Sequence, residues 1–390
     1  MSSLLSRAKL LRRLILSLLI VCAACASASP NPTSLPEPTA THSPDGVLTI
    51  AQAQQADAPA LALSGGQVIA TWIGADERGV HQDARRVSAQ GLSEVVTLPL
   101  PPTHPYGQQL FPGDPADGST HLLWLDADET QTTTLYSALL TPDLSVIRGP
   151  VSVSEGLALD FSAVPDGAGG LWTVWSGGQF SELTLYLRRI DADGRPLLDK
   201  VALASSADHP ALVRTSEGAV WLFWLAEGQL MRQRIDQPDQ TAQALTGAIS
   251  LARGDRLINV RAALDATRAY FFWNITRADG ISETWWTSGT LTEEAWGQPV
   301  RLKAGSGTAL RWTTPLSGQP YTLIAAIESD AGLGIISLSN GVVIGFTNLR
   351  PAERLVGLPA LLIDAAGNFD LAWSALDTTT ANLQVITLKK

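Results

Sequence analysis

Short apolar runs that mostly end in tryptophan recur along this chain at a nearly constant spacing. Six of them are VIATW (68–72), HLLW (121–124), LWTVW (171–175), VWLFW (220–224), YFFW (270–273) and FDLAW (369–373). YTLI (321–324) stands between the last two, with Ile324 in place of the tryptophan, and the intervals between final positions are 52, 51, 49, 49, 51 and 49 residues. Seven copies at one period predict a repeat architecture.

Each repeat contains four short segments of β-strand character. A run such as PAL (59, 210 and 359) precedes a turn, and most repeats have a glycine six residues before the final position of the second run. A longer run such as LTLYLRRI (183–190) follows, and then an apolar-x-apolar segment such as Val151/Val153. The second runs are apolar on both faces, which predicts a core between neighbouring sheets. Four-stranded repeats of this length are typical of a β-propeller.

The two ends of the repeat region complement each other. The last repeat stops after its third segment, LQVITL (383–388), while GVLTIA (46–51) carries the fourth-segment pattern ahead of the first repeat. Pairing these segments would close the ring and remove an exposed sheet edge. The sequence therefore predicts an all-β domain over 46–390, a seven-bladed β-propeller of four-stranded antiparallel blades whose N-terminal strand 46–51 joins the C-terminal blade. The fourth strand of the sixth repeat is expected somewhere in 342–356, where Pro351 disturbs the pattern.

The first 45 residues have the composition of an export signal and a tether. Residues 1–25 combine four basic residues with an apolar run from Leu14 to Cys25, which is too short to span a bilayer. Residues 26–45 are rich in Pro, Ser and Thr, so they are expected to stay extended. The stretch before Cys25 resembles the lipobox of bacterial lipoproteins, and the resemblance implies lipid attachment at Cys25 and anchoring to the cell envelope. The alternative is cleavage after Ala28, which would release a secreted protein.

Net charge and the positions of the cysteines limit the classes of partner that the protein can bind. Both cysteines lie in the signal, and its removal would change the formal net charge from −10 to −14, which disfavours nucleic acid and anionic lipid as partners. The expected contact with membrane is therefore through the lipid only.

The repeat resembles the broad sialidase-like and kelch-like propeller class. That resemblance implies either a binding or scaffolding propeller, or a glycan-processing enzyme. The first is the leading hypothesis, because no catalytic constellation stands out.

A recurrent carboxylate follows the second run of several repeats. These residues are Asp76, Asp128, Glu227, Glu328 and Asp377. In propellers the loop after the second strand lies on the face where ligands usually bind, so the residues predict an acidic rim for a protein or glycan ligand on a monomeric protein. The alternative interpretation is an ordinary solvated loop in an acidic protein.

Other chemistry-bearing residues form weaker patterns. Four tryptophans depart from the repeat and are candidate ligand platforms: Trp285, Trp286, Trp296 and Trp312. A sialidase-like centre would need an arginine clamp and a tyrosine. The candidates, none of which sits in a recognisable motif, are Arg253, Arg256, Arg261 and Arg311, with Tyr106, Tyr270 and Tyr321. Asp208-His209 beside Ser205 and Ser206 is the one local cluster with nucleophilic potential, in a segment expected to be a plain loop. The histidines show no metal-ligand spacing and Asp191–Asp199 departs from a calcium loop, so no metal or cofactor is predicted.

Overall fold

The computed structural model describes residues 46–388, apart from short gaps. The gaps are 54, 78, 89–90, 101–102, 180–181, 198, 227–228, 238–240, 246–254, 265–267, 294–295, 305–309, 313–315, 319–320, 329–331, 340–341, 351–354, 364–367 and 378–379. The chain divides into two compact units, residues 1–37 and 38–390, and the described residues belong to the second. The predicted export signal, Cys25 and the tether lie outside the described residues. No helix in the described part has the length and apolarity needed to cross a membrane.

The described chain is all-β, with 29 strands in six antiparallel sheets. The first strands of the repeats are β2 (Gln55–Ser64), β7 (Pro105–Pro112), the second half of β10 (Val146–Pro165), β14 (Ala207–Arg214), β18 (Arg256–Leu264), β22 (Leu310–Trp312) with β23 (Leu316–Gly318), and β27 (Leu355–Ile363). The second strands are β3 (Gln67–Asp76), β8 (Thr120–Ala127), β11 (Leu171–Gln179), β15 (Val220–Ala226), β19 (Ala269–Thr276), β24 (Tyr321–Glu328) and β28 (Phe369–Asp377).

The outer half of each repeat follows the same order. The third strands are β4 (Gly79–Ser88), β9 (Thr133–Leu140), β12 (Glu182–Ile190), β16 (Gln229–Arg234), β20 (Ser282–Gly289), β25 (Gly332–Ser339) and β29 (Thr380–Leu388). The fourth strands are β5 (Gly91–Leu92) with β6 (Val96–Thr97), the first half of β10, β13 (Val201–Ser205), β17 (Gln243–Ala244), β21 (Val300–Ala304) and β26 (Val342–Arg350). The predicted strand within 342–356 is therefore present as β26, ending before Pro351.

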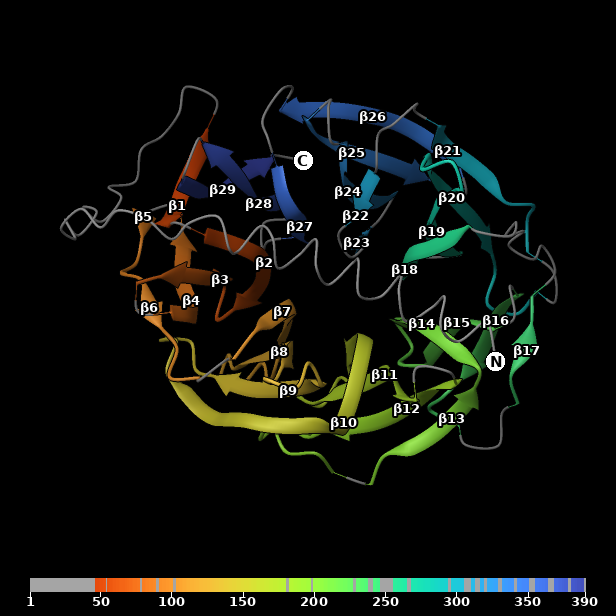
Figure 1. Ribbon diagram of the computed structural model, residues 1–390, viewed down its shortest axis with the longest axis horizontal. Helices are drawn as coiled ribbons and strands as arrows, with labels where there is room; N and C mark the ends of the chain where they lie inside the picture. The colour runs from red at the N-terminus through yellow and green to blue at the C-terminus, as the bar shows by residue number, and fades with distance from the viewer. Residues whose placement is uncertain are drawn as a thin grey trace. The chain divides into compact units, whose positions relative to one another are not determined.

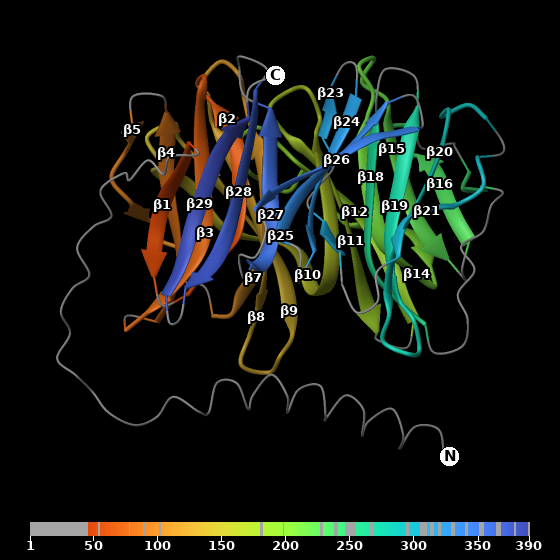
Figure 2. The same cartoon turned by 90° about the horizontal axis from the view of Figure 1, so that it is seen from above.

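The segment from the N-terminal end of the repeat region pairs with the C-terminal end, as predicted. Strand β1 (Val47–Ala53) lies antiparallel to β29, with Val47 opposite Ile386 and Ala53 opposite Ala381. Figure 2 shows β1 beside β29. The sheet order β1-β29-β28-β27 gives the last repeat its fourth strand.

Strand β10 explains why seven repeats give six sheets. Its first half pairs with β9 and its second half with β11, so one continuous strand belongs to two repeats. The first strands also contact one another from repeat to repeat: β2 touches both β7 and β27, and β14 touches both β10 and β18. Figure 1 shows β2, β7, β14, β18 and β27 on the inner side of their sheets.

The core lies between sheets rather than within one sheet, as the two-sided apolar strands predict. One cluster joins Phe223 of β15 to Phe271 and Trp273 of β19, and another joins Ile50 of β1 to Trp72 of β3. The repeat-ending tryptophans described here are almost fully buried: Trp72, Trp124, Trp175, Trp224, Trp273 and Trp373. Burial of large aromatic surface on both faces of each sheet stabilises the packing of neighbouring repeats.

The repeated glycine makes the turn into the second strand. Gly66, Gly118, Gly169 and Gly218 have φ of 79°, 69°, 87° and 90°. Residues with a Cβ avoid this left-handed region, so the turn selects glycine.

Candidate functional site

A β-bulge interrupts the first strand of several repeats at the same place. The register shifts between Asp57 and Ala60 in β2, between Tyr106 and Gln109 in β7, and between Asp208 and Ala211 in β14. A bulge bends the strand and redirects a side chain, and such bulges are common beside active sites. The repeated bulge therefore places redirected residues at the same end of β2, β7 and β14.

His209 occupies this bulge in a backbone conformation that is unusual for histidine. Its φ is 55°, and the corresponding residues Ala58 and Gly107 have φ of 47° and 59°. A left-handed non-glycine residue costs of order 1–3 kcal/mol and is found preferentially at functional sites. In this repeat the bulge carries a titratable side chain, where two other repeats have a small residue.

Asp160 of the neighbouring repeat holds the His209 ring. His209 Nδ1 lies 3.4 Å from Asp160 Oδ2, and the side chains are 20% and 28% exposed. The backbone N–H of Phe161 donates to Asp160 Oδ1 at 2.8 Å, which fixes the carboxylate. On the other side of the ring, His209 Nε2 lies 3.6 Å from Asp208 Oδ2. His209 is therefore oriented by one carboxylate and lies near a second.

The surroundings of His209 and Asp160 favour the protonated imidazole and the ionised carboxylate. Burial acts to lower the pKa of His209, but the hydrogen bond to Asp160 and the charge of Asp208 outweigh it and raise the pKa above its usual value. Burial likewise acts to raise the pKa of Asp160, but the contact with His209 and the charge of Arg261 hold it below its usual value. Asp160 is thus an anion at neutral pH, and the neighbouring carboxylates of Asp160 and Asp208 stabilise the protonated form of His209.

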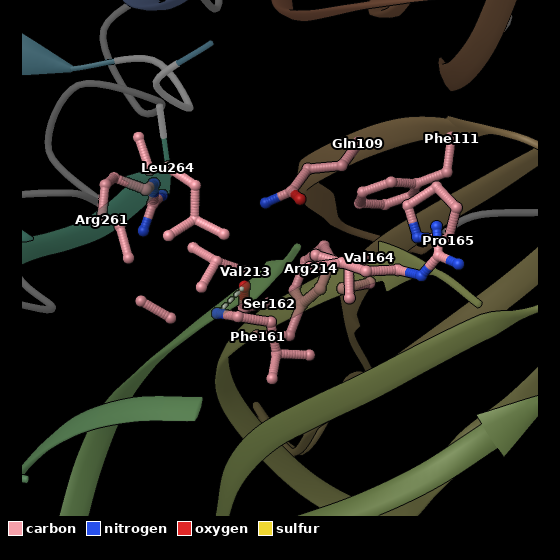
Figure 3. Close-up of a pocket in the computed structure, with 15 residues that line it drawn as sticks. Gln109, Phe111, Phe161, Ser162, Val164, Pro165, Val213, Arg214, Arg261 and Leu264 are labelled. Atoms are coloured by element: carbon pink, nitrogen blue, oxygen red, sulfur yellow. Dashed lines mark hydrogen bonds between the residues drawn. The ribbon is translucent and has the colours of Figure 1, made fainter. Parts of the chain in front are cut away.

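A cavity of about 230 Å³ lies along the inner strands that carry this pair, and its lining on these strands begins at Phe161 and Ala211, next to the pair rather than at His209 or Asp160. Figure 3 shows the side chains of Arg261 from β18 and Gln109 from β7 directed into it from opposite sides. Arg261 Nη1 donates to the Val260 carbonyl at 2.7 Å. Farther along the cavity, Val213 and Leu264 contribute apolar lining, and Arg214 supplies a second guanidinium. The polar part can therefore accept an anionic group, because guanidinium and amide N–H groups approach the same space.

Tyr106 adds a neutral proton donor near Asp160. Its hydroxyl donates to Thr133 Oγ1 at 3.0 Å, and 40% of the residue is exposed. Desolvation first, and then the negative charges of Asp160 and Asp126, raise the pKa of Tyr106, which outweighs the opposing effect of Thr133. The phenol is accordingly protonated at neutral pH.

The predicted acidic rim is described at only two of its five positions. Asp76 Oδ1 lies 3.9 Å from His81 Nδ1. Asp128 accepts the backbone N–H groups of Thr130 and Thr132 at 2.8 and 2.9 Å, so it stabilises its own turn. Glu227 and the side chains of Glu328 and Asp377 lie outside the described part. The rim as a ligand site stays a prediction.

Several weaker candidates occupy structural positions. Trp286 and Trp296 are each 5% exposed, so they belong to the core, and their interpretation as ligand platforms is wrong. Trp285 Nε1 donates to Glu283 at 2.9 Å, and the Trp312 side chain lies outside the described part. The N–H of Asp191 donates to the carbonyl of Arg195 at 2.8 Å in a hairpin turn. Among the described residues, no group of three or more His, Cys, Asp or Glu is arranged to hold a metal.

Sequence reasoning placed His209 in a plain loop, which is wrong, because Ala207–Arg214 is strand β14. It missed Asp160 altogether, since that residue lies 49 positions away in another repeat. A usable signal was present in the repeat itself. DAPAL (57–61) and DHPAL (208–212) differ only where His209 replaces Ala58. An exchange of a small residue for histidine at one repeat position indicates a specialised site.

Comparisons with known proteins bear on the fold of the chain. No family model matches the chain, and no curated protein matches it. Among solved structures, the polysaccharide lyase Uly1 superimposes with a TM-score of 0.56 at 10% identity, covering 94% of each chain. A variant of the NanB sialidase from Streptococcus pneumoniae has a TM-score of 0.44 at 11% identity, covering 93% of this chain and 72% of that one. A GH43_1 enzyme from Xanthomonas citri has a TM-score of 0.40 at 9% identity, covering 62% and 90%. The likeness to Uly1 shows a shared propeller-like fold.

Proposed function

We propose that residues 46–390 form a seven-bladed β-propeller whose ring is closed by β1. Two equivalent hydrogen bonds support this closure. Arg188 of the third repeat donates to the carbonyl of Val153, in the fourth strand of the preceding repeat, at 3.0 Å. Arg85 of the first repeat donates to the carbonyl of Ile50 in β1 at 2.8 Å. Ile50 therefore has in β1 the position that Val153 has in its fourth strand. By this correspondence β1 is the fourth strand of the last repeat, which precedes the first repeat around the ring.

We further propose that the protein is a glycan-processing enzyme with its reaction centre at the His209 bulge. The observation that carries this proposal is the His209–Asp160 contact at 3.4 Å beside a cavity into which Arg261 is directed. A histidine oriented by a carboxylate is a common general acid or base. The fold shared with a polysaccharide lyase over 94% of both chains supports glycan as the substrate class.

The residue types at the site fit elimination from an acidic glycan. Arg261 would bind the carboxylate of a uronic acid, which acidifies the hydrogen on the adjacent carbon. His209 in its neutral form, which its raised pKa places on the alkaline side of its titration, would take that proton. The electron pair would form a carbon–carbon double bond, and the bond to the glycosidic oxygen would break. Tyr106 would give its proton to the leaving oxygen. Each proton and electron pair is then accounted for, and both side chains return to their starting states by exchange with water.

Hydrolysis fits this site less well. Hydrolysis by paired carboxyl groups requires one of them to be protonated as the acid. Asp160 has a lowered pKa because His209 and Arg261 stabilise its anion. The binding-only hypothesis rests on the acidic rim, of which Asp128 is already engaged in its own turn.

For location, we propose export and lipid attachment at Cys25, with cleavage after Ala28 as the competing outcome. The pattern of residues 1–45 supports it. The mass of the mature N-terminus distinguishes the two, because lipid adds acyl chains to Cys25, whereas a mature chain that starts unmodified at Ser29 contradicts the anchor.

The enzyme proposal is tested with a panel of soluble uronate-containing polysaccharides. Elimination gives a new ultraviolet absorbance from the unsaturated product, whereas hydrolysis gives only new reducing ends. His209→Ala copies the residue that the first repeat has at this bulge, so the fold is expected to tolerate it. We expect it to lower kcat/KM by about 10²- to 10⁴-fold.

The exposed His104→Gln serves as the matched control and should retain parental activity. Parental turnover in His209→Ala would overturn the assignment of the reaction centre. Absence of any product from the parent across the panel would overturn the enzyme proposal in favour of a binding propeller.

A further inference from the structure

A second cavity, of about 210 Å³, lies between the fourth and fifth repeats, away from the His209 bulge. Its wall includes the ring of Trp221 and the side chains of Arg232, Gln243 and Thr292. Trp221 lies opposite Val213 at one end of the β14–β15 pair, whereas Asp208 lies opposite Leu225 at the other end. The cavity is therefore separate from the proposed reaction centre.

The internal repeat shows what is unusual about Trp221. Three residues before the end of the second run, other repeats bury their side chain: Ile69 at 1%, His121 at 0%, Tyr270 at 0% and Asp370 at 4% exposure. Trp172 and Trp221 are partly exposed at the same position. A partly exposed indole at a position that is otherwise buried leaves part of its ring accessible from the surface.

An arginine lies over the ring in both repeats, and Trp172 and Trp221 differ in how that arginine is held. In the third repeat, Arg189 lies over the Trp172 ring at 4.8 Å and is fixed there by Asp166, at 2.7 Å from its guanidinium. In the fourth repeat, Thr215 stands at the position of Asp166. The corresponding arginine, Arg234, instead pairs with Asp236 at 2.9 Å. Arg232 lies over the Trp221 ring instead, at 5.7 Å from the ring centre, and Trp221 also lines the second cavity.

The remaining wall supplies hydrogen-bonding groups at fixed positions. Arg232 is 3% exposed, its guanidinium carbon lies 5.7 Å from the centre of the Trp221 ring, and it donates to Gln243 Oε1 at 3.2 Å. Thr241, Gln243 and Thr292 are exposed around the opening. An aromatic face bordered by amides, hydroxyls and a held guanidinium suits a hydroxyl-rich ring that is apolar on its faces and polar at its edge.

We propose that this cavity is an auxiliary binding site for a single sugar ring of a glycan chain, packed against the accessible part of the Trp221 ring. Its volume is below the roughly 300–1,000 Å³ of pockets for larger ligands, which matches one ring rather than an oligosaccharide. The site would hold the protein on a polymer independently of any reaction at His209.

The test measures glycan binding without turnover. In the His209→Ala background, migration is recorded by affinity electrophoresis in gels that contain dissolved xylan or dissolved polygalacturonate. We expect at least one polymer to retard the protein, and Trp221→Ala to weaken the apparent affinity about tenfold. Trp172→Ala is the matched control, because Asp166 fixes Arg189 over that ring, and it should bind like the His209→Ala protein.

A second variant separates binding from folding. Thr241→Ala removes the hydroxyl of an exposed wall residue, and it should also weaken binding by several-fold. The proposal is overturned if neither polymer retards the protein, if Trp172→Ala and Trp221→Ala weaken binding equally, or if Thr241→Ala binds as tightly as its parent. A negative result in this binding test says nothing about turnover at His209, so the two proposals are tested separately.

Discussion

Replacing Ile50 with alanine tests whether β1 is an integral part of the core. Ile50 is fully buried, and it packs in one cluster with Trp72 of the first repeat and Leu383 of the last. Truncating a fully buried isoleucine to alanine costs about 2–5 kcal/mol, from lost transfer free energy and the cavity left behind. The equilibrium between folded and unfolded protein should therefore shift by roughly 30- to 4,000-fold.

The assay is urea unfolding, combined with hydrogen exchange over 380–388. The parent, Ile50→Ala and Gln52→Ala are compared, because Gln52 lies on the same strand but is exposed. Gln52→Ala should change the free energy of unfolding by less than about 0.5 kcal/mol. Ile50→Ala should also speed exchange in β29, its partner strand. An unfolding free energy for Ile50→Ala equal to that of Gln52→Ala, with β29 exchange unchanged, would refute the closure argument.

Two further predictions concern pH. Asp160→Asn removes the hydrogen-bond partner that raises the pKa of His209, so the acidic limb of the kcat/KM profile should move to lower pH; an unmoved limb would show that another group titrates. His121 is fully buried, and this burial lowers its pKa despite the contact of Nε2 with the Gly169 carbonyl. Its contribution to stability should therefore be complete above about pH 6.5 and fall as the pH drops toward the folded-state pKa. His121→Gln should flatten the fall in urea midpoint between neutral pH and pH 5, and an identical slope would contradict this.

The strand pattern could be predicted from the sequence because every repeat contains the same local features. The glycine before the second strand adopts positive φ in Gly66, Gly118, Gly169 and Gly218, and the two-sided apolar runs are buried between sheets. The local pattern gave a wrong prediction of exposure for Trp286 and Trp296. Both depart from the repeat in sequence, yet both are buried, because a residue's exposure depends on which neighbouring sheet covers it.

The candidate site was beyond local pattern for a related reason. His209 and Asp160 are 49 residues apart, and neither forms a motif with its sequence neighbours. The repeat length brings them together, because equivalent positions of consecutive repeats lie side by side on the inner strands. A different constant separation, of 35 residues, joins the third strand of one repeat to a fourth strand beside it and pairs Arg85 with Ile50 and Arg188 with Val153.

The sequence by itself determined the all-β class, the repeat period, the strand order within a repeat and the pairing of 46–51 with 383–388. These follow from apolar periodicity and turn glycines, which act over a few residues. Only the tertiary structure decided that His209 meets Asp160 beside the Arg261 cavity, and that Trp221 lines the second cavity whereas a fixed Arg189 lies over Trp172. Those contacts join different repeats, so they depend on how whole sheets pack and on which charged partner each side chain finds.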